Sequence, residues 1–517
     1  MKCKNERGVA LILTLILLLI VSVMAVSLMF ISQTETWASM NYKLMSQSRD
    51  GAEAGINAAA NYIINTYSPP ASSGADLLSS YNNNVSPVQY PAANTSGHDV
   101  ILATSSSSQT SNYPVSSVKT AFGSNAQNGL TAGNVTVNYN SSAKLLSQVQ
   151  VIPYGSSAYQ TVQTWQLTSD GAISGIRNAD EEVSAILEKQ ITPVYSYAAF
   201  ASATGCGAMN FGGGGTTNSY DSSNMTMSGG APVVAASGGN VGTNGNLAEN
   251  GNPTNINGSL STPRTGTGTC SSGNVTAWTN SSGHVNGGIV DLPQQVNYPN
   301  PSAPNPTPPT NSANALTLHN NAGDCGGVTG CSLGTGVAPS CASGDLCLAP
   351  GICPLTAGGP VVTTLGGLYG DITIKGTVHL SAGCYNINSL TENGQGTLTI
   401  DSGPVVINIA GTGQSTPIDL TGGGLVNTAG GFNAASLQFI YGGSGTVKLA
   451  GGASSTGVLY APNSTLTMTG GSTWYGAVIT GTMTDMGGAT INYDQNLQKQ
   501  AATVSNWMLD SFTWKKN

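Results

Sequence analysis

The sequence contains few charged residues. Lys, Arg, Asp and Glu make up 7% of its 517 residues, against about 25% in ordinary soluble domains. Between Lys189 and Lys375 the only basic residue is Arg264, and the net charge is −8. Nucleic acid binding needs a basic patch or stripe, which this composition does not supply. We therefore expect no nucleic acid partner, and a surface hydrated mainly by neutral Ser, Thr and Asn side chains.

The short motifs of common enzymes and metal sites are also missing. The sequence has no nucleophile elbow and no P-loop, and the glycines of Gly212–Gly215 are not followed by Gly-Lys-Ser. No CxxC pair occurs, and His98 and His284 stand alone. We therefore expect no catalytic, cofactor-binding or metal-binding residues, and no cofactor.

A long uncharged segment, Gly8 to Thr34, follows three basic residues near the N-terminus. Its apolar run from Val9 to Ile31 would extend roughly 34 Å as a helix, enough to cross the hydrocarbon core of a bilayer. Because basic flanks mark the cytoplasmic side, the N-terminus is predicted to stay in the cytoplasm. The sequence thus predicts a single-pass inner-membrane anchor with an exported remainder.

The helical pattern continues past the apolar run. Apolar residues recur at intervals of three or four, as on one face of an amphipathic helix: Trp37, Met40, Leu44, Ala52, Ile56, Ala59 and Ile63. Ser68-Pro69-Pro70 ends the pattern, because proline cannot sit inside a helix. We predict one helix over residues 9–67, with its first half in lipid and its second half against a protein surface.

Two motifs in this helix resemble a known family. Glu6-Arg7-Gly8 before Val9 resembles the type III signal of type IV pilins, which is cut after the glycine. The stretch from Arg49 to Ile56 resembles the "AEAG" stretch of PilX-like minor pilins. The resemblance implies a leader of residues 1–8, cleavage between Gly8 and Val9 by a prepilin peptidase, and methylation of the new amine. It also implies other pilins and the pilus assembly machinery as partners, and the pilus or cell surface as the final location.

Leu13 departs from the family pattern. Most major pilins carry glutamate at this fifth mature position, where it pairs with the N-terminal amine of a neighbouring subunit. Its absence favours a minor subunit of a type IV pilus or a secretion pseudopilus. The alternative that these motifs leave open is a signal-anchored envelope protein with no role in a filament.

Eight cysteines follow the leader, which itself contains Cys3. An even set in an exported chain indicates disulfides, but eight cysteines allow 105 pairings, so none is assigned. With only His319 nearby, a zinc site is the poorer interpretation. The candidate disulfide cysteines are Cys206, Cys270, Cys325, Cys331, Cys341, Cys347, Cys353 and Cys384.

Short alternating runs between residues 68 and 194 predict strands. They are bounded by Gly, Ser and Asn, and Pro193 closes the module. Four or five such strands could cover the amphipathic half of the helix as an antiparallel sheet. The first module is therefore expected to be the pilin fold that the N-terminal resemblance implies.

From residue 195 to 497 strand-like runs recur with glycine between them. The pairs Gly451-Gly452, Gly470-Gly471 and Gly487-Gly488 are 19 and 17 residues apart. Repetition at this spacing is typical of stacked coils, and it predicts a parallel β-helix. The region from about Leu368 to Leu497 also resembles the β-solenoid that accompanies PilX-like N-termini in some large bacterial proteins. The predicted fold class is α+β and mainly β: a long pilin-type helix on an antiparallel sheet, followed by a β-helix.

Two parts of the second module stand out. Residues 292–358 hold a run of prolines and five of the cysteines, and we expect an insertion that projects from the coil stack. Such a loop could bind a partner or cover a coil edge. Residues 498–517 carry several aromatic side chains, which we expect to cap the last coil.

A β-helix could also be a membrane-anchored polysaccharide-active enzyme with closely placed carboxylates. The candidate side chains form no compact motif, so we expect a structural subunit that contacts a glycan or a protein on another surface. These candidates are Asp371, His379, Glu392, Asp401, Asp419, Asp485 and Asp494.

Overall fold

A computed structural model of the chain describes most residues of the protein. It covers all but 1–5, 93–96, 133–134, 152, 155–158, 175–177, 251–253, 281–282, 311–314, 336–340, 352–366, 395, 423, 428–430, 450–454, 469, 485–486, 500–501 and 517. Two compact units emerge: residues 1–150, 161–190 and 507–517 form the first, and residues 151–160 and 191–506 form the second. The predicted combination of one long helix with a chain that is otherwise mainly β is confirmed in outline.

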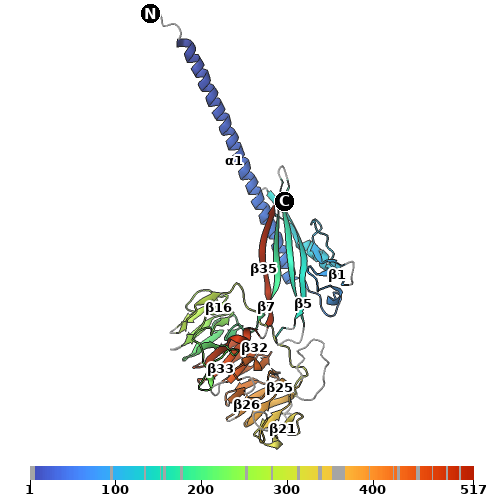
Figure 1. Ribbon diagram of the computed structural model, residues 1–517, viewed down its shortest axis with the longest axis vertical. Coiled ribbons are helices and arrows are strands. Elements are labelled where there is room, and N and C mark those ends of the chain that lie inside the picture. Colours follow the sequence, from blue (N-terminus) through green and yellow to red (C-terminus); the bar gives the residue numbers. More distant parts are fainter. Residues whose placement is uncertain are drawn as a thin grey trace. The chain divides into compact units, whose positions relative to one another are not determined.

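Helix α1 runs from Glu6 to Asn65 (Figure 1). In its first half, the large apolar side chains from Val9 to Ile31 are 46–72% exposed, so nothing in the described chain covers them. Among the described residues, it is the one helix long and apolar enough to cross a membrane. The helix ends at Asn65, just before the prolines that were expected to stop it.

The second half of α1 packs on the first unit's sheet. Ala52, Ile56, Ala59 and Ile63 are at most 1% exposed and join one core cluster with the buried side chains of the strands. The predicted apolar stripe is confirmed from Leu44 onward. Its earlier members Trp37 and Met40 were expected to be buried but are exposed, because the packing begins only near Ser48, whose hydroxyl donates to the Gly171 carbonyl.

Three glycines allow α1 and the sheet to lie in close contact. A Cβ on Gly51 would collide with Val137, and one on Gly55 with Ser169. On the sheet side, a Cβ on Gly171 would collide with the Ser48 carbonyl of the helix. The "AEAG" stretch therefore has a packing role, since its glycines form the surface of α1 that contacts the strands.

The sheet of the first unit has the strand order β3-β5-β6-β7-β35, with β4 paired to β5. The pairs β3–β5, β4–β5 and β6–β7 are antiparallel, and burial alternates along β6 as expected for a sheet with one covered face. The strands are β3 (Ile101–Ala103), β4 (Gln127–Ala132), β5 (Val135–Val151), β6 (Gln160–Ile173), β7 (Ala179–Pro193) and β35 (Ala502–Lys516). Smaller elements are η1 (Leu78–Ser80), β1 (Gln89–Tyr90), β2 (His98–Asp99) and α2 (Ser116–Asn125).

The C-terminal segment corrects one expectation. Residues 498–517 were expected to cap the last coil of the second module, but β35 pairs with β7 at the edge of the first unit's sheet. Trp507 and Leu509 pack against the core that the helix and this sheet share, and Lys189 lies over the Trp507 ring. A free strand edge on β7 attracts a pairing partner, and the apolar side chains of the C-terminal segment suit that place.

The second unit is built almost entirely of short parallel strands. Its strands are β8 (Ala199–Ala201), β9 (Met209–Gly212), β10 (Thr216–Tyr220), β11 (Met227–Ser228), β12 (Ala231–Pro232), β13 (Val241–Thr243), β14 (Leu247–Asn250), β15 (Asn255–Ile256), β16 (Leu260–Thr262), β17 (Trp278–Asn280), β18 (His284–Val285), β19 (Ile289–Asp291), β20 (Leu316–Leu318), β21 (Cys331–Leu333), β22 (Leu346–Leu348), β23 (Leu368–Ile374), β24 (Thr377–Leu380), β25 (Gly383–Glu392), β26 (Thr397–Ile400), β27 (Val405–Ile409), β28 (Ile418–Leu420), β29 (Gly424–Asn427), β30 (Leu437–Tyr441), β31 (Thr446–Leu449), β32 (Ser455–Thr467), β33 (Thr473–Thr484) and β34 (Thr490–Asp494). Short 3-10 turns are η3 (Ala322–Cys325), η4 (Ala434–Ser436) and η5 (Gln495–Lys499).

These strands pair in three columns. One column contains β19-β16-β13-β8, a second β17-β14-β9 and a third β18-β15-β10, all in parallel register. Strand β33 then pairs with β8 and β9, and β34 pairs with β10. The remaining strands continue from β33 through β32, β30, β27, β25 and β23. The chain therefore enters this stack near its middle, winds to one end, crosses to the other end, and winds back.

Side-chain ladders reinforce the column of β10. The amide of Asn218 donates to Asn492 (3.1 Å), that of Asn257 to Asn218 (2.8 Å), and that of Asn286 to Asn257 (2.6 Å). Asn218 and Asn257 each use an amide N–H toward one neighbour and the side-chain oxygen toward the other. This pairing satisfies polar groups that the flat stacking of strands brings together.

The proline-rich segment is the crossing between the two ends. The Tyr460 hydroxyl donates to the Pro299 carbonyl (2.6 Å), the Asn463 amide donates to Asn300 (2.8 Å), and the Asn386 amide donates to the Pro306 carbonyl (3.1 Å). Its oxygen atoms thus accept from residues of β32 and β25 in the stack. We call residues 293–309 the strap.

The structure therefore corrects the expected projecting insertion at 292–358. Besides the strap, it contains β20, which pairs in parallel with β23, and β22, which pairs in parallel with β24. The leucines of both strands are at most 3% exposed. Leu-Thr-Leu and Leu-Cys-Leu alternate apolar and polar side chains, so they fit the stack as further strands.

Candidate functional site: a polar pocket beside Arg264

A pocket of about 730 Å³ lies in the second unit, where the strap passes the strands of the stack. Its lining is mainly polar: Ser202, Asn244, Arg264, Gln294, Gln295, Asn297 and Asn463, together with Pro263, Val296, Tyr298 and Pro462. Such a volume lies within the range of sites for small molecules. Because the walls combine one cation with many amides, the pocket suits a hydrophilic ligand.

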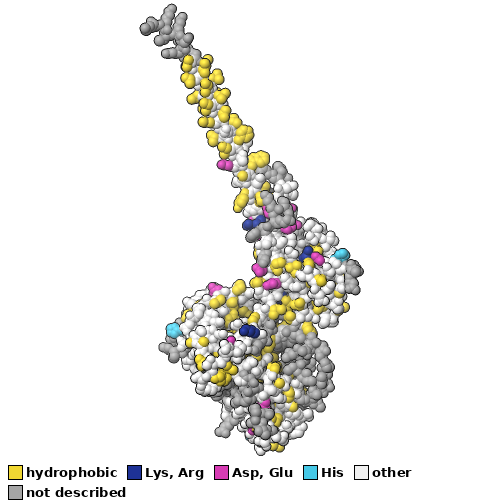
Figure 2. Space-filling model, viewed as in Figure 1, with side chains coloured by type: hydrophobic (Ala, Val, Ile, Leu, Met, Phe, Trp, Pro, Cys, Tyr) yellow, Lys and Arg dark blue, Asp and Glu magenta, His cyan; other side chains and the backbone are white. Residues whose placement is uncertain are grey.

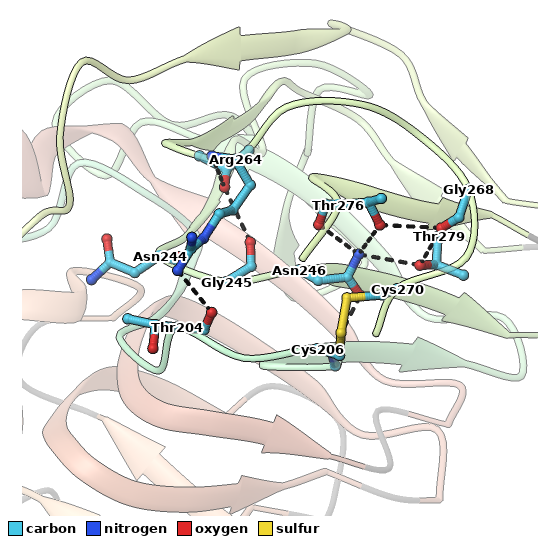
Figure 3. Close-up of a disulfide and its surroundings, with 12 residues drawn as sticks. Thr204, Cys206, Asn244, Gly245, Asn246, Arg264, Gly268, Cys270, Thr276 and Thr279 are labelled. Carbon is cyan, nitrogen blue, oxygen red and sulfur yellow. Dashed lines mark hydrogen bonds between the residues drawn. A yellow bond between two sulfur atoms is a disulfide. The ribbon is translucent and has the colours of Figure 1, made fainter. Parts of the chain in front are cut away.

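Arg264 is fixed by the backbone around it. Its Nε donates to the Asn244 carbonyl and its Nη2 to the Thr204 carbonyl, both at 3.0 Å. Its own N–H donates to the Thr262 hydroxyl (3.2 Å). Figure 3 shows the side chain lying between the two segments that it bridges. The guanidinium is therefore held in one place by two backbone carbonyls.

The segment that carries Thr204 is itself tied down by a disulfide. Cys206 is bonded to Cys270, which lies in the loop between Arg264 and β17 (Figure 3). Beside it, the Asn246 amide donates to the Thr276 carbonyl (2.9 Å), and its oxygen accepts from the Gly207 N–H (3.2 Å). These bonds fix the loops on both sides of the guanidinium.

Asn244 joins the strap to the stack at the pocket wall. Its amide donates to the carbonyls of Val296 (2.8 Å) and Ser202 (3.1 Å), and its oxygen accepts from the Val296 N–H (2.8 Å). Ser202 in turn donates to the Pro462 carbonyl (2.6 Å). The buried Asn244 side chain thus fixes the distance between the strap and the strands, and with it the width of the pocket.

The charge of Arg264 has no acidic counterpart in the described chain. No carboxylate among the residues that the structure describes lies within ion-pair distance of it. Charged side chains are scattered thinly over the face of the second unit in Figure 2, most of which is neutral. The local potential at the pocket is therefore set by one cation in a weakly charged surface.

The sequence did not predict this pocket. It identified Arg264 as the only basic residue between Lys189 and Lys375, but the amides come from three separated segments. The residues join only because the strap crosses the stack there. The isolated arginine in a nearly neutral stretch was the one signal in the sequence that pointed to the pocket.

Two of the side chains considered for an enzyme, His379 and Asp401, lie together. His379 Nδ1 lies 2.7 Å from Asp401, and its Nε2 lies 3.2 Å from Asp345, which the sequence did not single out. Asp371 accepts from Asn388 and Ser389, while Asp419 pairs with Lys448 at 3.6 Å. Asp485 lies outside the described residues. No group of three His, Cys, Asp or Glu able to hold a metal occurs in the described part of the chain.

Two more candidates are buried. Burial raises the pKa of Glu392 to about 7, against a hydrogen bond from the Leu398 N–H that lowers it. Burial also raises the pKa of Asp494, although the N–H groups of Ser222, Ala434 and Asn496 donate to its carboxyl. At 1% and 0% exposure neither can reach a substrate.

Seven of the eight candidate cysteines are disulfide-bonded in the structure. Besides Cys206–Cys270, it contains the disulfides Cys325–Cys331 and Cys341–Cys347, each spanning a sequence separation of six residues. Cys384 is also disulfide-bonded. Cys353 lies outside the described residues. The expected processing residues Gly8 and Val9 lie near the start of α1.

Comparison with known proteins bears on the N-terminal part of the chain. Residues 7–57 match the family model described as PilX N-terminal. This segment is a PilX-type pilin N-terminus. The match confirms the PilX-like resemblance seen in the sequence for residues 7–57. The matched residues 7–57 include the exposed apolar half of α1 and the two helix glycines, Gly51 and Gly55, that pack on the sheet.

Other comparisons say less. Residues 368–500 match the model of a domain of unknown function (DUF7305). Among solved structures, the competence-associated pilin ComZ from Thermus thermophilus is similar over 76% of this chain and 88% of that chain, at 12% identity and a TM-score of 0.24. That TM-score is too low to support an argument. A search of the curated proteins gives no match.

Proposed function

We propose that the protein is a minor pilin, a structural subunit of a type IV pilus or of a secretion pseudopilus. The observation that carries the proposal is the PilX-type N-terminus on a helix with two different halves. The first half exposes mainly apolar side chains and suits lipid or a bundle of like helices. The second half is buried on the subunit's own sheet.

The exposed half of α1 supports two successive environments. In the membrane, its apolar side chains would face lipid, with the basic residues before it on the cytoplasmic side. After a prepilin peptidase cuts between Gly8 and Val9, the same surface would pack against the helices of neighbouring pilins. Leu13 stands where major pilins carry glutamate, so the subunit would enter the filament in small numbers.

The second unit is proposed to be a parallel β-helix displayed on the outside of the filament. The three columns of parallel strands, the asparagine ladder and the strap support this description. A long stack offers a broad, neutral surface suited to adhesion or another surface contact, with the Arg264 pocket as its candidate ligand site. The domain order is then leader, helix, pilin-like sheet and β-helix.

Replacement of Gly8 tests this function. In cells that build pili, Gly8→Val blocks the peptidase and leaves the chain in the membrane, so it disappears from pili sheared off the cells. Gly123→Ala, at a helical glycine with open space around it, is the matched control and stays in the sheared fraction. Recovery of Gly8→Val in sheared pili at the level of the control would refute the proposal.

A further inference from the structure

We propose that the Arg264 pocket binds a carboxylate-bearing saccharide, such as a uronate oligomer. Arg264 would bind the carboxylate, and the amides of the pocket would bind the ring hydroxyls. This inference rests on the proposed function, because an exported subunit displayed on a filament meets such polymers on other surfaces. It assigns a ligand class to a pocket that has no other role in the fold.

The Arg264 guanidinium keeps three N–H donors that can bind an anion. Arginine has five N–H donors, and the carbonyls of Asn244 and Thr204 occupy one on Nε and one on Nη2. The three that are left belong to the two terminal nitrogens, which is the pair that binds a carboxylate through two parallel hydrogen bonds. Because no described carboxylate neutralises Arg264, the site is complementary to a ligand with negative charge.

The other lining groups favour a saccharide over a small inorganic anion. Gln294 and Asn297 are exposed at the pocket, and each amide offers both donors and an acceptor. Asn463 is exposed there too and offers its side-chain oxygen, because its amide N–H groups donate to Asn300 and Gly442. Sugar hydroxyls also donate and accept, so such amides can follow a row of them. A pocket of about 730 Å³ would leave a phosphate or sulfate ion with most of these groups unused.

The pocket is also rigid before any ligand arrives. Asn244 makes three side-chain hydrogen bonds, and its carbonyl holds Arg264. The Cys206–Cys270 disulfide fixes the neighbouring loop (Figure 3). A preorganised site loses little conformational freedom on binding, which favours affinity for a flexible polar ligand.

Titration calorimetry on the full-length protein in detergent tests the assignment. The probes are tetragalacturonate, its full methyl ester, acetate and tetraglutamate. We expect tetragalacturonate to bind at least tenfold more tightly than each of the others. Equal binding of the methyl ester would overturn the role of the carboxylate, equal binding of acetate or tetraglutamate would overturn the saccharide, and no binding of tetragalacturonate would overturn the whole assignment.

Two variants locate the binding. Arg264→Gln should weaken tetragalacturonate at least tenfold, whereas Lys375→Gln removes the same charge from an exposed position elsewhere in the second unit and should leave binding unchanged. If Arg264→Gln fails to fold, the exposed variant Asn463→Ala takes its place and is expected to weaken binding at least threefold. Loss of binding in Lys375→Gln, or full binding in the pocket variant, would contradict the proposal.

The failure of this inference and that of the proposed function can be told apart. Arg264→Gln should enter sheared pili as the unaltered protein does, because its change lies outside α1 and the first unit. A protein that enters pili but does not bind tetragalacturonate would overturn the ligand and leave the minor pilin intact. A protein that binds the probe but never enters pili would do the reverse.

Discussion

Ala199 lies opposite Val478 in parallel register, although these residues come from the first and last parts of the second unit. Ala199 also pairs with Val241 on its other side. The strand that enters the stack is therefore inserted between two others. Neither half of the stack is completed without the strand that opens the unit, so the two halves should unfold together.

Replacement of the neighbouring residue Phe200 tests whether the two halves of the stack unfold together. Phe200 is fully buried, and its ring lies 4.8 Å from that of Tyr298 in the strap. Phe200→Ala should destabilise the second unit by about 3–5 kcal/mol, because it leaves a cavity where three strands and the strap meet. Val233→Ala, at a side chain that is 55% exposed, is the control. Thermal unfolding should show one transition for the unit, at a lowered melting temperature. Separate melting of the two halves would contradict the claim that they unfold together.

Packing of α1 on its sheet depends on the glycines of the "AEAG" stretch. Gly55→Ala should destabilise the first unit by about 1–3 kcal/mol, since the new Cβ would collide with Ser169 and approach the Ser141 hydroxyl at 2.8 Å. Gly123→Ala in α2 meets nothing within 4 Å and should stabilise by about 0.5–1 kcal/mol. Denaturant unfolding of both variants measures the difference. Equal effects would show that the close approach is unimportant.

This contrast shows what the sequence could predict and what it could not. The spacing of Ala52, Ile56 and Ile63 predicted the buried face of α1, because helical periodicity is local. The end of the helix followed from its prolines. Nothing local marked where the sheet would begin, so Trp37 and Met40 were wrongly placed in the buried stripe.

The arrangement of the second unit was harder to predict from the sequence for a similar reason. Repeated short strands predicted stacked coils, but the order in which the strands pair depends on contacts between distant segments. The strap looked like the start of a projecting insertion because prolines cannot donate to a ladder. In the structure its carbonyls accept from Tyr460 and Asn386 instead. The Arg264 pocket and the pairing of β35 with β7 depend on the same kind of distant contact.

Glu392 should make the stability of the second unit depend on pH. Its folded pKa of about 7 lies above the ordinary value of 4.5, so the unfolded chain loses the proton first as pH rises. The stabilisation is complete below about pH 4.5 and is lost as the pH rises through 7. Across this window the ionisation of Glu392 should lower the free energy of unfolding by up to about 3 kcal/mol, and Glu392→Gln should remove this fall.

Melting temperatures measured between pH 4.5 and 8 check this effect. Glu249 is also buried, and burial raises its pKa to about 7. It should therefore lower the melting temperature in a similar way as the pH rises. Glu392→Gln should reduce the dependence of the melting temperature on pH without abolishing it. Asp291→Asn at an exposed carboxyl of the same unit is the control. An unchanged slope in Glu392→Gln would contradict the assigned pKa.

The disulfides should differ in their contribution to stability. Cys206 and Cys270 are 64 residues apart in sequence, whereas Cys341 and Cys347 are six apart. Loop-closure entropy predicts a loss of about 4 kcal/mol when Cys206 and Cys270 are both replaced by serine, and about 2 kcal/mol for Cys341 and Cys347. Denaturant unfolding of the two double variants compares them directly. A larger loss for the shorter loop would show that loop entropy does not decide their effect.

The mass of the mature N-terminus tests the central claim most directly. Pili sheared from cells that express the protein are digested, and the N-terminal peptide of this chain is identified by mass spectrometry. A minor pilin predicts that the chain is present in the sheared fraction and begins at Val9 with a methylated amine. Chains that still carry Met1 in that fraction, or that occur only in the membrane of cells actively building pili, would contradict the account.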